Sequence, residues 1–182
     1  VMTNPTRAHF INVLNRMGAN IKITRTYSKC GEDVCDMVVT SSELKGTIIT
    51  KEEVPSLIDE FLILSVAAAY ARGTSKFCGL SELRVKESDR IDAMAKGLRS
   101  NGLSIEEGED WWSVEGREID GVKGGGLCET FLDHRIAMSF LILGMASKSS
   151  VKIDDSSPIT TSFPIFESLM AELGANFQKS EL

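Results

Sequence analysis

Residues 83–92 read Leu-Arg-Val-Lys-Glu-Ser-Asp-Arg-Ile-Asp, a run that crowds three cations and three carboxylates around one expected helix start. A helix that begins near Ser88 would point its unpaired N–H groups toward Lys86 and Glu87, and the side chain of Arg90 could reach the same space. The run therefore predicts a site that binds phosphate or carboxylate groups. A solvated charged turn is the alternative, because surface ion pairs are common and weak.

Two further blocks favour the binding site over the charged turn. Residues 132–140 read Leu-Asp-His-Arg-Ile-Ala-Met-Ser-Phe, and residues 161–164 read Thr-Ser-Phe-Pro. In this order the three blocks resemble signature segments of the 5-enolpyruvylshikimate-3-phosphate synthase family (3-phosphoshikimate 1-carboxyvinyltransferase). The likeness runs from about Pro55 to the end, is weaker before it, and covers only the C-terminal portion of the family.

The composition is that of an ordinary soluble globular chain. Its 182 residues are 42% hydrophobic and 25% charged, which is enough for one well-buried domain and indicates no second complete one. The formal net charge of −6 argues against a general nucleic-acid binder. An anionic ligand must therefore be attracted by a local basic patch, which the quoted blocks would supply.

The cysteines and histidines do not form a recognisable metal site. No Cys-x-x-Cys pair occurs, and His9 and His134 are the only histidines. We expect free thiols in a reducing cytoplasm. A disulfide between Cys30 and Cys35 is the alternative for a secreted protein, which no signal peptide supports.

Three segments repeat one pattern, an amphipathic helix that runs through a glycine into a strand-like stretch. They are residues 10–23, 94–107 and 169–178, with Gly18, Gly102 and Gly174 as the helix-ending glycines. Each of these helices should bury one face only. Strands are expected at residues 21–26, 37–40, 103–107, 112–115 and 151–154.

A second unit recurs at residues 59–80 and 133–155, where an acidic residue starts a helix that is apolar on all sides. Such a helix must lie inside the domain, and the apolar runs 61–71 and 136–146 are too short to span a bilayer. We therefore expect no membrane insertion. The run Gly124-Gly125-Gly126 lacks the Lys-Ser/Thr of a phosphate loop and is expected to be a flexible connection.

These units define the expected fold. A solenoid of two and a half repeats would leave apolar ends uncapped, so closed packing is favoured. The resemblance implies an inside-out α/β barrel of the enolpyruvyl transferase type, built from βαβαββ repeats. Residues 1–182 would be a single incomplete C-terminal domain of the usual two, with repeat units at about 1–50, 51–117 and 118–182.

The resemblance also implies a reaction. The enolpyruvyl group of phosphoenolpyruvate is transferred to shikimate 3-phosphate and phosphate is released, without a metal or an organic cofactor. The partner of this chain would be the N-terminal domain of the same enzyme, so the chain alone should be inactive. Alternatives are a fragment of a UDP-N-acetylglucosamine enolpyruvyl transferase and a non-catalytic domain that binds a phosphorylated ligand or a protein.

The matching positions carry the family's roles onto this sequence. Asp59 would be the base that accepts the shikimate hydroxyl proton, and Glu87 the acid–base group at the phosphoenolpyruvate methylene. Lys86 would contact shikimate 3-phosphate. Arg90 and Arg135 would bind phosphoenolpyruvate, because guanidinium groups suit phosphate and carboxylate oxygens.

Structural readings of the same residues stay open. Ser56 and Asp59 fit a capping box, and Glu87 could simply pair with Lys86 or Arg90. Asp133 is expected to cap a helix, which would place the backbone amides of His134 and Arg135 beside the bound anion. His134 could donate to that anion or have a purely structural role.

Two positions depart from some family members. Glu82 stands where these carry asparagine before the Arg-Val-Lys segment, which puts a contact with the substrate phosphate in doubt there. Thr161 stands where they carry lysine, so the role of that lysine has no counterpart at this position.

Overall fold

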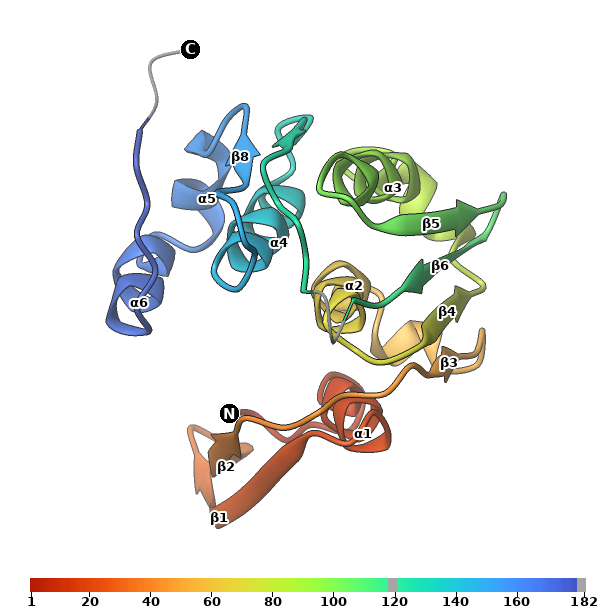
Figure 1. The fold of residues 1–182 in the computed structure, drawn as a ribbon. Helices are drawn as coiled ribbons and strands as arrows, with labels where there is room; N and C mark the ends of the chain where they lie inside the picture. Colours follow the sequence, from red (N-terminus) through yellow and green to blue (C-terminus); the bar gives the residue numbers. More distant parts are fainter. Residues whose placement is uncertain (118–120, 180–182) are drawn as a thin grey trace.

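The computed structural model describes residues 1–117 and 121–179. Within them the chain is a mixed α/β structure (Figure 1). The helices are α1 (His9–Arg16), α2 (Phe61–Ala69), α3 (Arg90–Ser100), α4 (His134–Gly144), α5 (Ser157–Ser162) and α6 (Phe166–Glu172), with short 3₁₀ helices η1 (Val54–Ser56) and η2 (Ser81–Val85). The strands are β1 (Asn20–Lys29), β2 (Glu32–Thr40), β3 (Ile48–Ile49), β4 (Thr74–Cys78), β5 (Ser104–Glu107), β6 (Trp111–Glu115), β7 (Leu127–Cys128) and β8 (Lys152–Ile153).

The two helices predicted to be apolar on all sides lie inside the molecule. Figure 1 shows α2 beside strands β4 and β6, and α4 between α2 and the segment that carries β8 and α5. Trp112 of β6 is fully buried against α2, and its indole Nε1 donates to Ser65 Oγ at 3.0 Å. Because each large apolar side chain buried in this way contributes about 1.5–3 kcal/mol, these helices supply much of the stability.

Two parallel strand pairs carry the internal repeat. β3 pairs in parallel with β4, and β7 pairs in parallel with β8, each pair being joined through one buried helix, α2 or α4. Parallel strands need such a crossover, because a tight turn can join only antiparallel strands. β4, β6 and β5 complete a four-stranded sheet in the order β3-β4-β6-β5. The second recurring unit that the sequence predicts is therefore present twice.

The three predicted helix-ending glycines have the left-handed backbone that this position requires. Their φ angles are 96° at Gly18, 87° at Gly102 and 94° at Gly174. After α1 the N–H of Ala19 donates to the carbonyl of Leu14 at 2.9 Å, and equivalent bonds follow α3 and α6. A Cβ is strained at such φ values, so glycine ends all three helices in the same way.

The predicted starts of two helices are wrong by two residues. α3 begins at Arg90 rather than near Ser88, because the side chain of Asp89 accepts from the N–H of Asp92 and caps it. α2 begins at Phe61 rather than at Asp59, and no side chain caps it. The capping box of Ser56 and Asp59 does not form.

The glycine run is not the flexible connection expected from the sequence. The N–H of Gly124 donates to the carbonyl of Asn101 at 3.2 Å, and the N–H of Gly126 donates to Asn101 Oδ1 at 3.0 Å. A Cβ on Gly126 would lie 2.6 Å from the carbonyl oxygen of Ser100. Glycine is therefore needed here because the backbone passes close to the end of α3.

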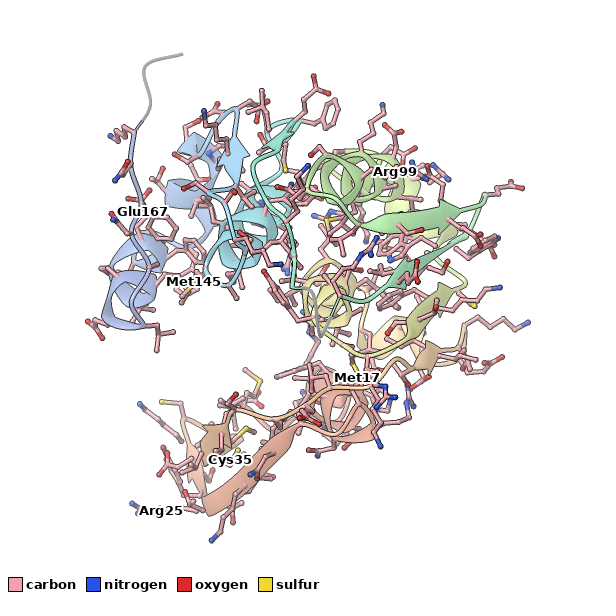
Figure 2. All side chains as sticks on the ribbon, viewed as in Figure 1. Met17, Arg25, Cys35, Arg99, Met145 and Glu167 are labelled. Carbon is pink, nitrogen blue, oxygen red and sulfur yellow. The ribbon has the colours of Figure 1, made fainter. Side chains whose placement is uncertain are left out.

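The antiparallel hairpin of β1 and β2 stands away from the buried helices (Figure 2, where Arg25 and Cys35 mark it). An apolar groove of about 680 Å³ lies between this hairpin and α1. The residues at the start of the chain pair with the outer edge of β2, where Val1 and Cys35 exchange two backbone hydrogen bonds of 2.7 Å.

Cys30 and Cys35 are both free thiols, so the alternative disulfide is absent. No helix in the described part of the chain is long and apolar enough to cross a membrane.

Glu53 fastens α1 to the segment that precedes α2. Its carboxylate accepts from Arg16 Nη1 at 2.9 Å and from the N–H of Thr50 at 3.0 Å, and it lies 2.9 Å from His9 Nε2. Burial raises the pKa of this carboxyl, but the bonds from these three partners outweigh it and lower the pKa to about 2. The fold therefore stabilises the ionised form of Glu53.

We expect Glu53→Gln to lower the free energy of unfolding by about 1–3 kcal/mol at neutral pH, because the amide loses the charge that Arg16 contacts. In the parent chain this stabilisation is complete above the ordinary glutamate pKa of 4.5 and is lost as the pH falls toward about 2. Urea unfolding followed by circular dichroism measures it, with Glu43→Gln at an exposed carboxylate as the control. A difference between parent and variant that stays constant through this pH range would contradict the assignment.

Candidate functional site

Charged side chains gather where the starts of α2, α3 and α4 meet. Asp59 comes from the turn before α2, Glu87 and Arg90 from the start of α3, and Asp133 and Arg135 from the start of α4. The ion pairs between them connect three segments that are far apart in the sequence. The structure thus brings together four of the six residues that the sequence predicts for the site.

Arg90 and Asp133 form a buried ion pair at the centre of this cluster. Arg90 is 1% exposed and Asp133 is 0% exposed, and Arg90 Nε donates to Asp133 Oδ2 at 2.8 Å. Ser88 Oγ also donates to Asp133 Oδ2, at 3.1 Å. Burial raises the pKa of Asp133, but the hydrogen bond and charge of Arg90 outweigh it and hold the pKa below its ordinary value. Asp133 is therefore ionised at neutral pH.

Asp133 also caps α4, as the sequence predicts. Its Oδ1 accepts from the backbone N–H of Arg135 at 2.9 Å. This bond corrects one expectation, because the amide of Arg135 is used by the cap and is not directed at a bound anion. The anion-binding capacity of Arg135 lies in its guanidinium group.

Asp59 lies among three arginines. Arg135 Nη1 donates to the carbonyl oxygen of Asp59 at 3.1 Å, and Arg135 Nη2 lies 3.4 Å from Oδ2. Arg90 Nη1 lies 3.9 Å from Oδ1, and Arg7 Nη2 donates to Oδ2 at 3.1 Å. Burial raises the pKa of Asp59, but the hydrogen bond from Arg7 and the charges of Arg135, Arg7 and Arg90 together lower it. Asp59 is thus an ionised carboxylate able to accept a proton.

Glu87 is half exposed and faces the same arginine. Arg90 Nη2 donates to Glu87 Oε2 at 2.6 Å. The ion pair that served as the structural alternative for Glu87 is therefore present. Glu87 and Asp59 thus contact two different nitrogens of the Arg90 guanidinium group. The ion pair and the proposed role of Glu87 in proton transfer are therefore compatible.

Lys86 and His134 lie next to the cluster but are not joined to it. Lys86 Nζ donates to Glu82, the residue one helical turn earlier. His134 is the half-buried first residue of α4. Among the residues that the structure describes, no hydrogen bond links either side chain to Asp59, Arg90 or Arg135. Their predicted roles stay predictions.

The expected basic patch is compensated by carboxylates of the chain itself. Arg7, Lys86, Arg90 and Arg135 each pair with at least one of Asp59, Glu60, Glu82, Glu87 and Asp133. The cluster and the separate Lys86–Glu82 pair thus set four cations against five carboxylates, without an excess of positive charge. An anionic ligand must therefore replace carboxylates of the chain as the partners of these cations.

Sequence reasoning missed Arg7 and Glu60. Arg7 lies in the turn before α1, 52 residues from Asp59 in sequence, and also contacts Glu60 Oε1 at 3.4 Å. The only local signal was the Asn4-Pro5-Thr6 turn, which indicates a fixed backbone but no partner. No sequence signal marked Glu60, because an acidic residue just before a helix is common.

The site provides cations and carboxylates rather than a metal centre. In the described residues, no group of three or more His, Cys, Asp or Glu side chains is arranged to hold a metal ion. Chemically, the arrangement can bind anionic oxygens through guanidinium groups and can exchange protons at Asp59 and Glu87.

Comparison with known proteins relates the chain to one family. A family model described as EPSP synthase (3-phosphoshikimate 1-carboxyvinyltransferase) matches residues 1–170. A curated relative named 3-phosphoshikimate 1-carboxyvinyltransferase, from Ruegeria sp., is 54% identical over 179 residues, which are 98% of this chain and 40% of that protein. The protein of the same name from Brucella canis is 49% identical over 180 residues, 99% of this chain and 40% of that protein. The chain therefore spans about 40% of the length of the curated relatives it matches.

Solved structures confirm the predicted fold. An EPSP synthase structure from Acinetobacter baumannii matches with a TM-score of 0.94 and 38% identity, over 100% of this chain and 42% of that one. The enolpyruvyl transferase NikO from Streptomyces tendae matches with a TM-score of 0.68 and 16% identity, over 95% of this chain and 36% of that one. The chain has the inside-out α/β fold of enolpyruvyl transferases.

We expect Asp133→Ala to destabilise the chain by about 3–5 kcal/mol, because it leaves the buried charge of Arg90 without its partner and removes the cap of α4. Asp133→Asn should cost less, since an amide oxygen can still accept from the N–H of Arg135. Urea unfolding of both variants measures the difference. Equal loss in the two variants would show that the charge pair, rather than the cap, carries the whole effect.

Proposed function

Because the chain belongs to the EPSP synthase (3-phosphoshikimate 1-carboxyvinyltransferase) family, we propose that it forms one wall of the active site of such an enzyme. The enzyme transfers the enolpyruvyl group of phosphoenolpyruvate to shikimate 3-phosphate and releases inorganic phosphate. The observation that carries the proposal is the placement of two carboxylates on one guanidinium group. Asp59 lies 3.9 Å and Glu87 2.6 Å from nitrogens of Arg90.

The two carboxylates fit the two proton transfers of this reaction. Asp59 takes the proton of the shikimate hydroxyl as its oxygen attacks C2 of phosphoenolpyruvate. Glu87, in its protonated form, donates a proton to the methylene carbon in the addition step, and as a carboxylate it removes a proton from the resulting methyl group when phosphate leaves. Asp59 is partly buried and Glu87 half exposed, and such different surroundings suit one base and one reversible acid.

The cations would hold the two anionic substrates. Arg90 and Arg135 bind phosphoenolpyruvate, whose phosphate and carboxylate match the guanidinium fork, and His134 donates to the same anion. Lys86 leaves Glu82 and binds the phosphate of shikimate 3-phosphate. The contacts of Lys86, Arg90 and Arg135 each exchange a carboxylate of the chain for an oxygen of the substrate.

A partner must supply the opposite wall of the cleft. The chain covers about 40% of its curated relatives, so we propose that the N-terminal domain of the same enzyme completes the site and that the chain alone is inactive. We further propose that residues 1–182 form one incomplete domain with repeat units at about 1–50, 51–117 and 118–182. The names of the relatives do not favour the UDP-N-acetylglucosamine enzyme or a non-catalytic domain.

The cysteines support a cytoplasmic location. All four side chains are free thiols, and Cys35 and Cys128 are buried. Burial raises the pKa of Cys128 to about 11, so its thiol is neutral and unreactive at neutral pH. A reducing compartment keeps such thiols free.

A chimera tests the proposal. In it, this chain replaces the matching segment of the Ruegeria sp. protein, which is 54% identical. We expect the purified chimera to release phosphate from phosphoenolpyruvate only when shikimate 3-phosphate is present, whereas the chain alone releases none because half of the site is missing. UDP-N-acetylglucosamine should not replace shikimate 3-phosphate.

The parent Ruegeria sp. protein serves as the positive control for this experiment. A chimera that melts cooperatively but shows no turnover, while the parent is active, would refute the proposed function. Turnover by the chain alone would refute the incomplete site.

We expect Glu87→Gln in the chimera to lower kcat by about 10²–10⁴-fold, because an amide cannot donate or accept the methylene proton. The KM for shikimate 3-phosphate should change little. In deuterium oxide, the variant should also lose the incorporation of deuterium at the methylene carbon. The matched control is Glu106→Gln, at an exposed carboxylate on β5. Deuterium incorporation at the parent rate would exclude Glu87 from this role.

A further inference from the structure

We infer that Arg7 is a positioning residue that fixes the carboxylate of Asp59 by bridging it to Glu60. The inference rests on the proposed role of Asp59 as the base. It assigns a task to a side chain outside the three sequence blocks, and it specifies which oxygen of Asp59 accepts the proton.

The two oxygens of Asp59 have different surroundings. Oδ2 lies 3.1 Å from Arg7 Nη2 and 3.4 Å from Arg135 Nη2, so two guanidinium groups hold it from two sides. The contact of Oδ1 with Arg90 Nη1 is longer, at 3.9 Å. The carboxylate is therefore anchored through Oδ2, and Oδ1 is the oxygen that can accept the hydroxyl proton.

Local hydrogen bonds fix the backbone of Arg7 independently of the contacts that its side chain makes. Asn4 Oδ1 accepts from the N–H of Thr6 at 3.0 Å and from Thr6 Oγ1 at 2.8 Å. The carbonyl of Asn4 accepts from the N–H groups of Arg7 at 2.9 Å and of Ala8 at 2.8 Å. Pro5 fixes one further backbone angle in this turn. Arg7 thus starts from a defined position and loses less freedom on pairing with Asp59.

Glu60 shares the charge of Arg7. Its Oε1 lies 3.4 Å from Arg7 Nη2, the same nitrogen that contacts Asp59. Glu60 Oε2 is buried without a hydrogen-bond partner among the described residues, and burial raises the pKa of this carboxyl. A cation divided between two carboxylates lowers the basicity of Asp59 less than one devoted to it alone. Asp59 can thus be anchored and still act as a base.

The charged groups that face Asp59 come from every element packed around it. They are Arg7 from the turn before α1, Glu60 beside it in sequence, Arg90 from α3 and Arg135 from α4. Arg90 and Arg135 are also the proposed substrate ligands, so bound anions would compete for their charge. Arg7 is the cation of this group that has no proposed substrate to bind, and it can stay on Asp59 throughout the reaction.

The first test measures Asp59 directly in the isolated chain. Carbon-13 labelling of aspartate carboxyl groups allows the titration of Asp59 to be followed by NMR in the parent, Arg7→Gln and Arg7→Lys. We expect the pKa of Asp59 to rise in Arg7→Gln, since a hydrogen bond and a charge that favour the carboxylate are removed. Arg7→Lys should restore most of the parent value, because it keeps the charge.

The matched control is Arg99→Gln. Arg99 is 43% exposed, against 46% for Arg7, and pairs with Glu107 of β5 at 2.8 Å. It lies in the last turn of α3, at the opposite end from Arg90 (Figure 2). Asp59 should titrate in this variant as in the parent. An unchanged pKa of Asp59 in Arg7→Gln, in a chain shown to be folded by circular dichroism, would overturn the inference. If Arg7→Gln does not fold, Glu60→Gln decides it, because Arg7 would then pair with Asp59 alone and the pKa of Asp59 should fall. An unchanged titration of Asp59 in Glu60→Gln would then overturn the inference.

The second test uses the chimera and separates positioning from mere folding. Arg7→Gln should lower kcat about tenfold, change the KM for shikimate 3-phosphate less than about threefold, and move the acidic limb of kcat/KM to higher pH. A variant with an unmoved acidic limb would overturn the catalytic part of the inference. An inactive chimera with Arg7 intact would refute the proposed function instead, and the NMR titration would still decide whether Arg7 controls Asp59.

Discussion

The buried pair of Arg90 and Asp133 is the contact on which the rest of the site depends. The two residues are 43 apart in the sequence and join the starts of α3 and α4, with neither side chain exposed to water by more than 1%. Separating or removing one partner of such a pair would leave an unpaired buried charge and would strongly lower the free energy of unfolding. The pair therefore holds the two helix starts at a fixed distance. Through Arg90 the pair also orients Glu87, and through the cap of α4 it orients Arg135. Stability and the placement of the reactive groups thus come from the same contact.

The sequence predicts features that depend on neighbouring residues, such as helices and their ends, and misses contacts between residues that are far apart in the chain. Continuous apolar runs identified the buried helices α2 and α4, and the glycines after α1, α3 and α6 identified the helix ends, since both signals depend on neighbouring residues. Four of the six predicted site residues meet in space, because each stands within three residues of the start of α2, α3 or α4, and ion pairs join these three starts. The start of α3 was displaced by the cap that Asp89 forms, whereas α2 starts without a side-chain cap. Arg7 could not be predicted, because its partner lies 52 residues away and no periodic pattern relates them.

Charge compensation changes how the cluster must work. A patch with excess positive charge would accelerate the arrival of anions in a salt-dependent way, but here every cation already faces a carboxylate. If the cluster binds anions as proposed, binding is an exchange of partners, and its free energy is the difference between two sets of similar ion pairs. Such a site discriminates by geometry, because only an anion whose oxygens fit the fixed guanidinium groups can replace the carboxylates of the chain.

The exposed hairpin determines the colloidal behaviour of the isolated chain. Beyond the residues paired with Val1 and Met2, the edge of β2 carries Val38 and Val39, which are 53% and 68% exposed, next to the apolar groove. An open strand edge of this kind tends to pair with another chain. The net charge of −6 opposes such contacts by mutual repulsion. Added salt screens that repulsion. The chain therefore stays monomeric most readily at low ionic strength and associates as the ionic strength rises.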